Sequence, residues 1–208
     1  MKLKFLLGSA FVLFMTINAQ AQEFGARIGG NFSRFNYSVD EYNQDALSLF
    51  SLHIGATAIL PINDNIRING SLLYSQKGER FKDNGSTLKE VVNYIHLPFA
   101  VEYSFGGDQI KPFIQAGPYF SIAYSYKDKL DSPDLTGEVS YDIGNSESDD
   151  IAPTDFGLNI GGGLDIEKFR IGLNYEAGIS NLFPNGWNAN ETWKNSSFNI
   201  NVSYFINR

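Results

Sequence analysis

The chain has 208 residues, a formal net charge of −7 and no cysteine. The acidic balance argues against nucleic acid as a main partner, and the lack of cysteine excludes disulfides, thiolate metal ligands and a thiol nucleophile. Glycine (20), phenylalanine (17) and tyrosine (11) are abundant although only 43% of the residues are hydrophobic, a composition typical of many strands with tight bends in one or two domains.

The chain begins with the features of an export signal. Two lysines precede an apolar run over 5–17, which is too short for a comfortable membrane span. The stretch 19–21, Ala-Gln-Ala, then supplies the small residues that signal peptidase requires. We predict a signal peptide over 1–21, cleaved after Ala21, and a single domain over 22–208; an uncleaved anchor or a buried first helix is the alternative. No later segment is long and apolar enough for a transmembrane helix.

Eight segments of the mature chain alternate apolar and polar residues with a period of two, which predicts β-strands with one apolar and one polar face. The stretch FRIGLNYEAGIS shows the pattern, since Phe169, Ile171 and Leu173 alternate with polar residues and glycine. The eight segments cover 23–33, 50–60, 66–75, 94–105, 110–125, 155–166, 169–180 and 197–207.

The connections between these segments alternate in length. Three are short, at 61–65, 106–109 and 167–168, and four are long and polar, at 37–49, 77–90, 127–154 and 182–195. Strands joined in this way form an up-and-down antiparallel sheet, and closing that sheet into a barrel removes its open edges. We therefore predict an all-β fold: an eight-stranded antiparallel up-and-down β-barrel.

The composition of the polar face indicates whether the polar or the apolar face lies on the outside of the barrel. A soluble, lipocalin-like barrel turns its apolar face inward, whereas a transmembrane barrel turns it outward to lipid. A soluble exterior should be rich in lysine and glutamate, but this polar face is rich in glycine, which suits a narrow interior where side chains crowd. The glycines are Gly25, Gly29, Gly55, Gly117, Gly157, Gly161, Gly163, Gly172 and Gly178. The composition favours a transmembrane β-barrel, with a soluble periplasmic ligand-binding barrel as the alternative.

The charges of the polar face are balanced, with four of each sign when Glu23 is included. An unpaired charge in a small lumen costs several kcal/mol, so a balanced set indicates mutual pairing. We predict a structural charge network that plugs the lumen; eight independent solvated charges are the alternative. Its expected members are Arg27, Arg67, Glu102, Lys111, Asp165, Arg170 and Glu176.

Aromatic residues gather near both ends of the apolar face, as in the girdles at the two water–lipid interfaces. Phe24 and Phe169 lie toward the short connections, and Phe32 lies toward the long ones. Short turns belong on the periplasmic side and long loops outside, so both mature termini are expected in the periplasm. Trp187 and Trp193, in the last long connection, could meet a ligand or the outer headgroups.

Several stretches resemble the PorT-like outer-membrane β-barrel family. They are GARIGGNFS (25–33), LYSQKGERF (73–81), NYIHLPFAVEYSF (93–105), IKPFIQAGPYF (110–120) and FGLNIGGGLDI (156–166). The resemblance covers nearly all of the mature chain and implies an eight-stranded outer-membrane barrel. One founding member is associated with a secretion apparatus, and the family brings no catalytic motif.

We find no catalytic constellation in the sequence. A lipid-cleaving barrel needs a Ser–His pair that faces the bilayer, but the two histidines, His53 and His96, fall on the inward phase. We therefore expect an outer-membrane barrel of structural or binding type, with no catalytic residues, no cofactor and no metal. The expected partners are outer-membrane lipid and, through the resemblance, other envelope or secretion proteins; an accessory role in secretion is the alternative function.

Overall fold

In the residues that the structure describes, the regular structure consists of strands. The computed structural model describes residues 22–208 apart from 40–44, 84, 108, 134 and 186–190. The signal peptide predicted over 1–21 lies outside the described residues. Within the described part, no helix is long and apolar enough to cross a membrane.

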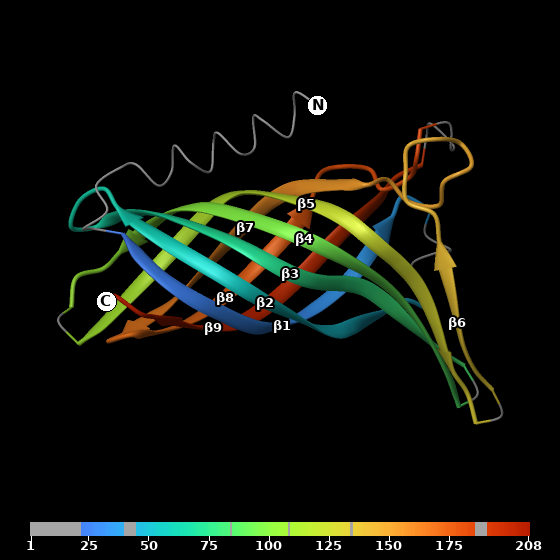
Figure 1. Ribbon diagram of the computed structural model, residues 1–208, viewed down its shortest axis with the longest axis horizontal. Helices are drawn as coiled ribbons and strands as arrows, with labels where there is room; N and C mark the ends of the chain where they lie inside the picture. Colours follow the sequence, from blue (N-terminus) through green and yellow to red (C-terminus); the bar gives the residue numbers. More distant parts are fainter. Residues whose placement is uncertain (1–21, 40–44, 84, 108, 134, 186–190) are drawn as a thin grey trace.

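Eight strands close into a ring in which each strand pairs antiparallel with both neighbours (Figure 1). The described residues form nine strands, and all of them except β6 belong to the ring: β1 (Glu23–Tyr37), β2 (Leu47–Pro61), β3 (Ile66–Asp83), β4 (Ser86–Ser104), β5 (Ile110–Asp131), β6 (Thr136–Tyr141), β7 (Thr154–Ile166), β8 (Phe169–Gly178) and β9 (Trp193–Phe205). Pairing of β4 with β5 and of β1 with β9 completes the ring, while β6 lies outside it and pairs with β5. The predicted all-β antiparallel barrel is confirmed, and β6 is a ninth strand that the sequence pattern did not indicate.

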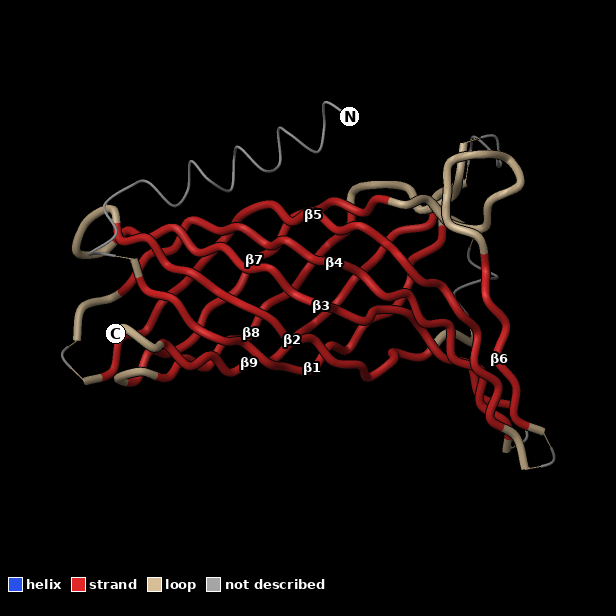
Figure 2. The backbone as a smooth tube through the Cα atoms, viewed as in Figure 1, coloured by secondary structure: helices blue, strands red, loops and turns tan. Residues whose placement is uncertain are grey.

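The two ends of the barrel differ. The short connections, at 62–65, 105–109 and 167–168, share one end, which we call the short-turn end (Figure 2). The two described chain ends meet there, because the amide of Phe24 donates to Asn207 Oδ1 (2.8 Å). Three longer connections, at 38–46, 142–153 and 179–192, lie at the opposite, long-loop end, and β3 also joins β4, and β5 joins β6, beyond that end.

The apolar phase of the strands faces outward and the polar phase faces inward. Ile171, Leu173 and Val202 expose 43%, 46% and 43% of their surface, whereas Arg27 and Glu176 expose 6% and 5%. Cross-strand register maintains this separation around the ring, since Ile171 stands opposite Val202 and alternate residues point to opposite faces. This arrangement is the reverse of a soluble barrel.

Glycine on the inward phase allows neighbouring strands to approach closely. A Cβ at Gly163 would lie 2.0 Å from the carbonyl oxygen of Ile171, and a Cβ at Gly55 would lie 2.1 Å from the carbonyl oxygen of Leu72. Both obstacles are backbone atoms, which cannot rotate away as a side chain can. At these positions the narrow interior therefore requires glycine.

Beyond the long-loop end, β3, β4 and β5 continue past the ring and join β6 in a four-stranded extension that reaches outside the barrel outline (Figures 1 and 2). We call it the projecting sheet; it comprises 78–83, 86–91, 127–131 and β6. The predictions of polar loops at 77–90 and 127–154 were therefore wrong over these strands. Charged residues replace the apolar face here, so the pattern used to recognise strands is lost, although the backbone pairing continues.

Substitution of Gly163 by valine should destabilise the barrel by about 1–3 kcal/mol, because the added side chain overpacks a wall formed by backbone. The measurement is the temperature at which the purified chain in detergent loses its heat-modifiable migration on a gel. Gly137→Ala in β6 is the control, because its Cβ meets nothing within 4 Å. Equal midpoints for the two variants would contradict the close approach.

Candidate functional site

The barrel interior holds a closed ring of four charges near the short-turn end. Arg170 binds Glu102 through Nη1 (2.9 Å) and Nη2 (3.0 Å), and it binds Asp165 through Nε (2.7 Å) and Nη2 (2.9 Å). Arg67 pairs with the same two carboxylates, with Nη1 lying 2.9 Å from Asp165 Oδ2. All four side chains are at most 7% exposed. The forked guanidinium groups thus satisfy carboxylates that burial would otherwise strongly disfavour.

Strand register explains why these four residues meet. Arg67 stands opposite Glu102 on β3 and β4, and Asp165 stands opposite Arg170 on β7 and β8. Directly opposed residues share a face, so each hairpin presents one ready-made ion pair to the lumen. Each arginine also binds the carboxylate of the other hairpin across the interior, Arg67 to Asp165 and Arg170 to Glu102.

Arg208 closes the short-turn side of this ring. Its Nη1 donates to Asp165 Oδ1 (2.7 Å), and its Nη2 lies 2.8 Å from Glu23 Oε2. Its guanidinium also lies over the Phe205 ring, 4.6 Å from the centroid. Sequence reasoning missed Arg208 because it follows the last alternating segment, although its place at the short-turn end could have indicated a role.

A second group of charges lies toward the long-loop end. Lys77 Nζ donates to Glu176 Oε2 (2.7 Å) and lies 4.0 Å from Asp155 Oδ2. His96 Nε2 lies 3.0 Å from Glu176 Oε1, and its Nδ1 lies 2.9 Å from Ser121 Oγ. The prediction that Glu176 points into the barrel agrees with this placement. Lys77 was missed because it was assigned to a loop.

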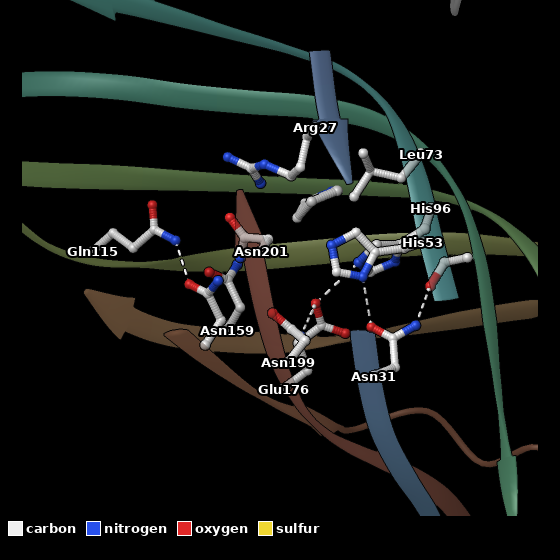
Figure 3. A pocket seen from close by; sticks show the side chains of 13 residues that line it. Arg27, Asn31, His53, Leu73, His96, Gln115, Asn159, Glu176, Asn199 and Asn201 are labelled. Atoms are coloured by element: carbon white, nitrogen blue, oxygen red, sulfur yellow. Dashed lines mark hydrogen bonds and ion pairs between the residues drawn. The ribbon is translucent and has the colours of Figure 1, made fainter. Parts of the chain in front are cut away.

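Between the two charge groups lies a small polar cavity (Figure 3). Arg27 reaches it from β1 and His53 reaches it from β2, with His53 Nδ1 2.8 Å from Asn31 Oδ1. The volume open to the centre of a water molecule is ≈ 20 Å³, which is room for about one water. Arg27 donates through Nε to Ser203 Oγ (3.2 Å) and belongs to neither charge group.

Lys111 does not join the interior network. It stands opposite Asp165 in the β5–β7 register, yet its side chain is exposed and forms no ion pair among the described residues. Asp165 already accepts from Arg170 and Arg208, and the next inward position of β5 is filled by Phe113. Six of the seven predicted members therefore lie inside the barrel, and Lys111 lies at its rim.

An aromatic cluster closes the long-loop end. Trp193 is buried at its centre, packing edge-on against Phe35 at 5.0 Å and stacking on Tyr37 at 5.8 Å. The buried members of the cluster are Phe35, Val92, Tyr94, Ala123, Tyr126, Ile151, Leu182 and Trp193. The expectation that Trp193 meets a ligand or headgroups is therefore wrong. The sequence did contain a signal for this cluster. At the long-loop ends of β1 and β4, the inward-facing positions change from polar residues to the apolar Phe35 and Val92.

The inward face of the projecting sheet carries a row of carboxylates. Glu79, Glu90 and Asp128 stand opposite one another on β3, β4 and β5. Tyr37 Oη donates to Glu79 Oε1 (3.0 Å), and Tyr126 Oη donates to Glu90 Oε2 (3.3 Å). Burial raises the pKa of Glu79 and of Glu90 to about 7, and the neighbouring carboxylates contribute to the rise at Glu90. No group of three or more residues in the described part has the arrangement of a metal site.

A ring of antiparallel strands with an apolar outer surface and a charge-paired interior is the architecture of an outer-membrane β-barrel protein. The sequence matches the family described as outer membrane protein beta-barrel domain over residues 18–184, and the chain belongs to that family. Family membership supports a location in the outer membrane.

Solved structures similar to this chain are distant. They include Ail of Yersinia pestis (15% identity, 89% of this chain and 99% of that chain, TM-score 0.43), Neisserial surface protein A (13%, 87% and 96%, 0.44) and the N-terminal barrel of Pseudomonas aeruginosa OprF (13%, 90% and 98%, 0.38). No curated protein matches the chain. At these identities and scores the solved structures support no argument about function.

Replacing Arg170 by leucine should cost about 3–5 kcal/mol of stability, because Glu102 and Asp165 would remain buried with one cation fewer. The heat-modifiability midpoint in detergent measures the loss. Lys111→Leu is the matched control and should change stability by no more than about 0.5 kcal/mol. If Arg170→Leu does not fold, Glu102→Gln should give a smaller loss of stability that can still be measured. Unchanged stability in both variants would refute a stabilising role of the charge ring.

The local stability of the projecting sheet should fall as pH rises. Because Glu79 and Glu90 bind protons more tightly in the folded sheet than their ordinary pKa of 4.5 allows, the folded state holds more protons than the unfolded state between about pH 4.5 and 7. The stability that these two protonated carboxyl groups contribute is therefore fully present below about pH 4.5 and is lost as pH rises through about 7. Amide hydrogen exchange in the β3–β4 hairpin, corrected for intrinsic rates, should show more opening at pH 7.5 than at pH 5.5.

Glu90→Gln should flatten this pH dependence, whereas Glu147→Gln, an exposed position in the loop before β7, should leave it unchanged. An equally steep profile in Glu90→Gln would contradict the assignment.

Proposed function

We propose that this chain is an integral outer-membrane barrel of structural or binding type that catalyses no reaction and whose interior does not conduct. The observation that carries the proposal is the buried ring of Arg67, Glu102, Asp165 and Arg170 inside a barrel with an apolar outer surface. A conducting pore needs a continuous water path. Here ion pairs fill one end and the aromatic cluster fills the other.

The proposed orientation puts the short turns in the periplasm and the long loops outside the cell. Short periplasmic turns and longer external loops are the rule for outer-membrane barrels. The contacts of Phe24 with Asn207 and of Arg208 with Glu23 keep the two described ends together at the short-turn end, which supports periplasmic termini.

The absence of catalysis is supported by where the two histidines lie. His53 and His96 are both buried in the interior, and His96 is flanked by Ser121 and Glu176. A Ser–His–carboxylate set needs access to an ester to act as a hydrolase. From inside the barrel this set reaches neither the lipid around the barrel nor the solvent beyond the aromatic cluster, so we assign it a structural role.

The narrower PorT-like identity, with an accessory role in secretion, stays a prediction from the resemblance. Deletion of the gene, followed by an assay of exported surface proteins, tests that role. A soluble periplasmic barrel is disfavoured by the outward apolar residues, and cell fractionation without detergent tests it directly.

In a planar bilayer, the folded chain should give no large, stable conductance steps. Heat-modifiable migration of the same preparation verifies that the barrel is folded, and a porin added to the same bilayer verifies that steps are detectable. Regular steps from the folded chain would refute the closed interior while leaving the membrane location intact.

A further inference from the structure

The outward face of the projecting sheet is basic although the chain as a whole is acidic. The face is the one on which Arg80 and Lys89 stand opposite each other, and on which Lys89 also stands opposite Lys129. Its charged residues are Arg80, Lys82, Lys89, Lys127, Lys129, Asp131 and Glu138. Five cations thus share the face with two carboxylates.

The register forces like charges into direct opposition. Arg80, Lys89 and Lys129 form a row across β3, β4 and β5, and like charges directly opposite on a sheet are destabilising. An anion bound over such a row makes it favourable, because the negative charge of the anion offsets the repulsion between the cations.

The protein neutralises only one side of this row. Glu138 on β6 pairs with Lys127 and with Lys129, whose Nζ lies 3.6 Å from Glu138 Oε2. In the part of the chain that the structure describes, Arg80, Lys82 and Lys89 form no ion pair, and Arg80 Nε is buried without a hydrogen-bond partner. The unneutralised cations are therefore those on β3 and β4.

The basic face continues the lipid-facing surface of the barrel. On β3 the outward phase runs from Leu72 and Tyr74 to Arg80, and on β4 it runs from Ile95 to Lys89. The cations thus begin where the apolar band ends, which is the level of lipid headgroups. The projecting sheet also extends sideways beyond the barrel outline (Figure 1), so it overhangs the zone that surrounding lipid occupies.

We propose that this basic face binds the phosphate groups of anionic lipid headgroups in the leaflet at the long-loop end. The inference rests on the proposed function, because it requires the barrel to sit in a bilayer. Arginine and lysine are the usual phosphate-binding side chains, and a basic segment next to a membrane gains about 1 kcal/mol per cation from an anionic surface. Free phosphate has the same chemistry, but the continuity of the face with the apolar band favours a lipid.

The test is a titration of the folded full-length mature chain, in nonionic detergent, with lipid A as a phosphorylated glycolipid probe. Lipid A should raise the heat-modifiability midpoint, and the midpoint against concentration gives an apparent Kd. Lys82→Gln/Lys89→Gln should raise that Kd about 25-fold, from roughly fivefold per cation. Glu138→Gln, on the same face, should lower it because it removes a competing carboxylate.

Three outcomes would overturn the proposal. The double variant could bind lipid A as tightly as the parent chain, Glu138→Gln could weaken binding, or inorganic phosphate alone could raise the midpoint as much as lipid A does. The midpoint of each variant without lipid A shows whether its fold is intact, and Arg80→Gln serves if the double variant does not fold. Absence of the parent chain from the outer-membrane fraction would instead refute the proposed function.

Discussion

The structure depends on the rule that hydrocarbon offers no partner to a backbone polar group. A sheet that crosses a bilayer must therefore hydrogen-bond along both edges of every strand, which only closure can achieve. Here β1 and β9, far apart in sequence, pair along most of their length and seal the ring. Closure with eight strands makes the lumen narrow, and period-two alternation sends every second side chain into it. The inward glycines and paired charges follow from that crowding.

The interior is layered along the barrel axis. The Arg67–Glu102–Arg170–Asp165 ring fills the short-turn end, the cavity beside Arg27 lies in the middle, and Lys77 with Glu176 lies beyond it. The aromatic cluster around Trp193 completes the sequence at the long-loop end. Charge pairs are costly to break singly, and the cluster excludes water at the end where the loops are longest. The two ends are thus closed by different interactions, one electrostatic and one apolar.

Much of this arrangement could be predicted from local patterns. Alternation identified the eight ring strands, and the two-residue connection at 167–168 made the Asp165–Arg170 pair accessible, because a short hairpin sets its own register. The Arg67–Glu102 pair was not accessible in this way, because a long loop was expected between its two strands at 77–90. Lys111 was mispredicted because register alone cannot tell that Asp165 is already saturated by other cations. Lys77 was missed because it fell in a stretch that was expected to be a polar loop, and Trp193 was misplaced because its partners come from strands distant in sequence.

On β3 and β4 the same alternation runs from the barrel into the projecting sheet, but the residue types change at a common level. On the outward phase, apolar residues give way to cations between Tyr74 and Arg80 on β3 and between Ile95 and Lys89 on β4. On the inward phase, paired charges give way to the aromatic cluster and then to Glu79 and Glu90. The backbone hydrogen bonds between the strands continue through this change, since they involve no side chains. On neighbouring strands, the outward-facing positions thus change from apolar to charged at the same level. This level marks where the apolar surroundings of the barrel end.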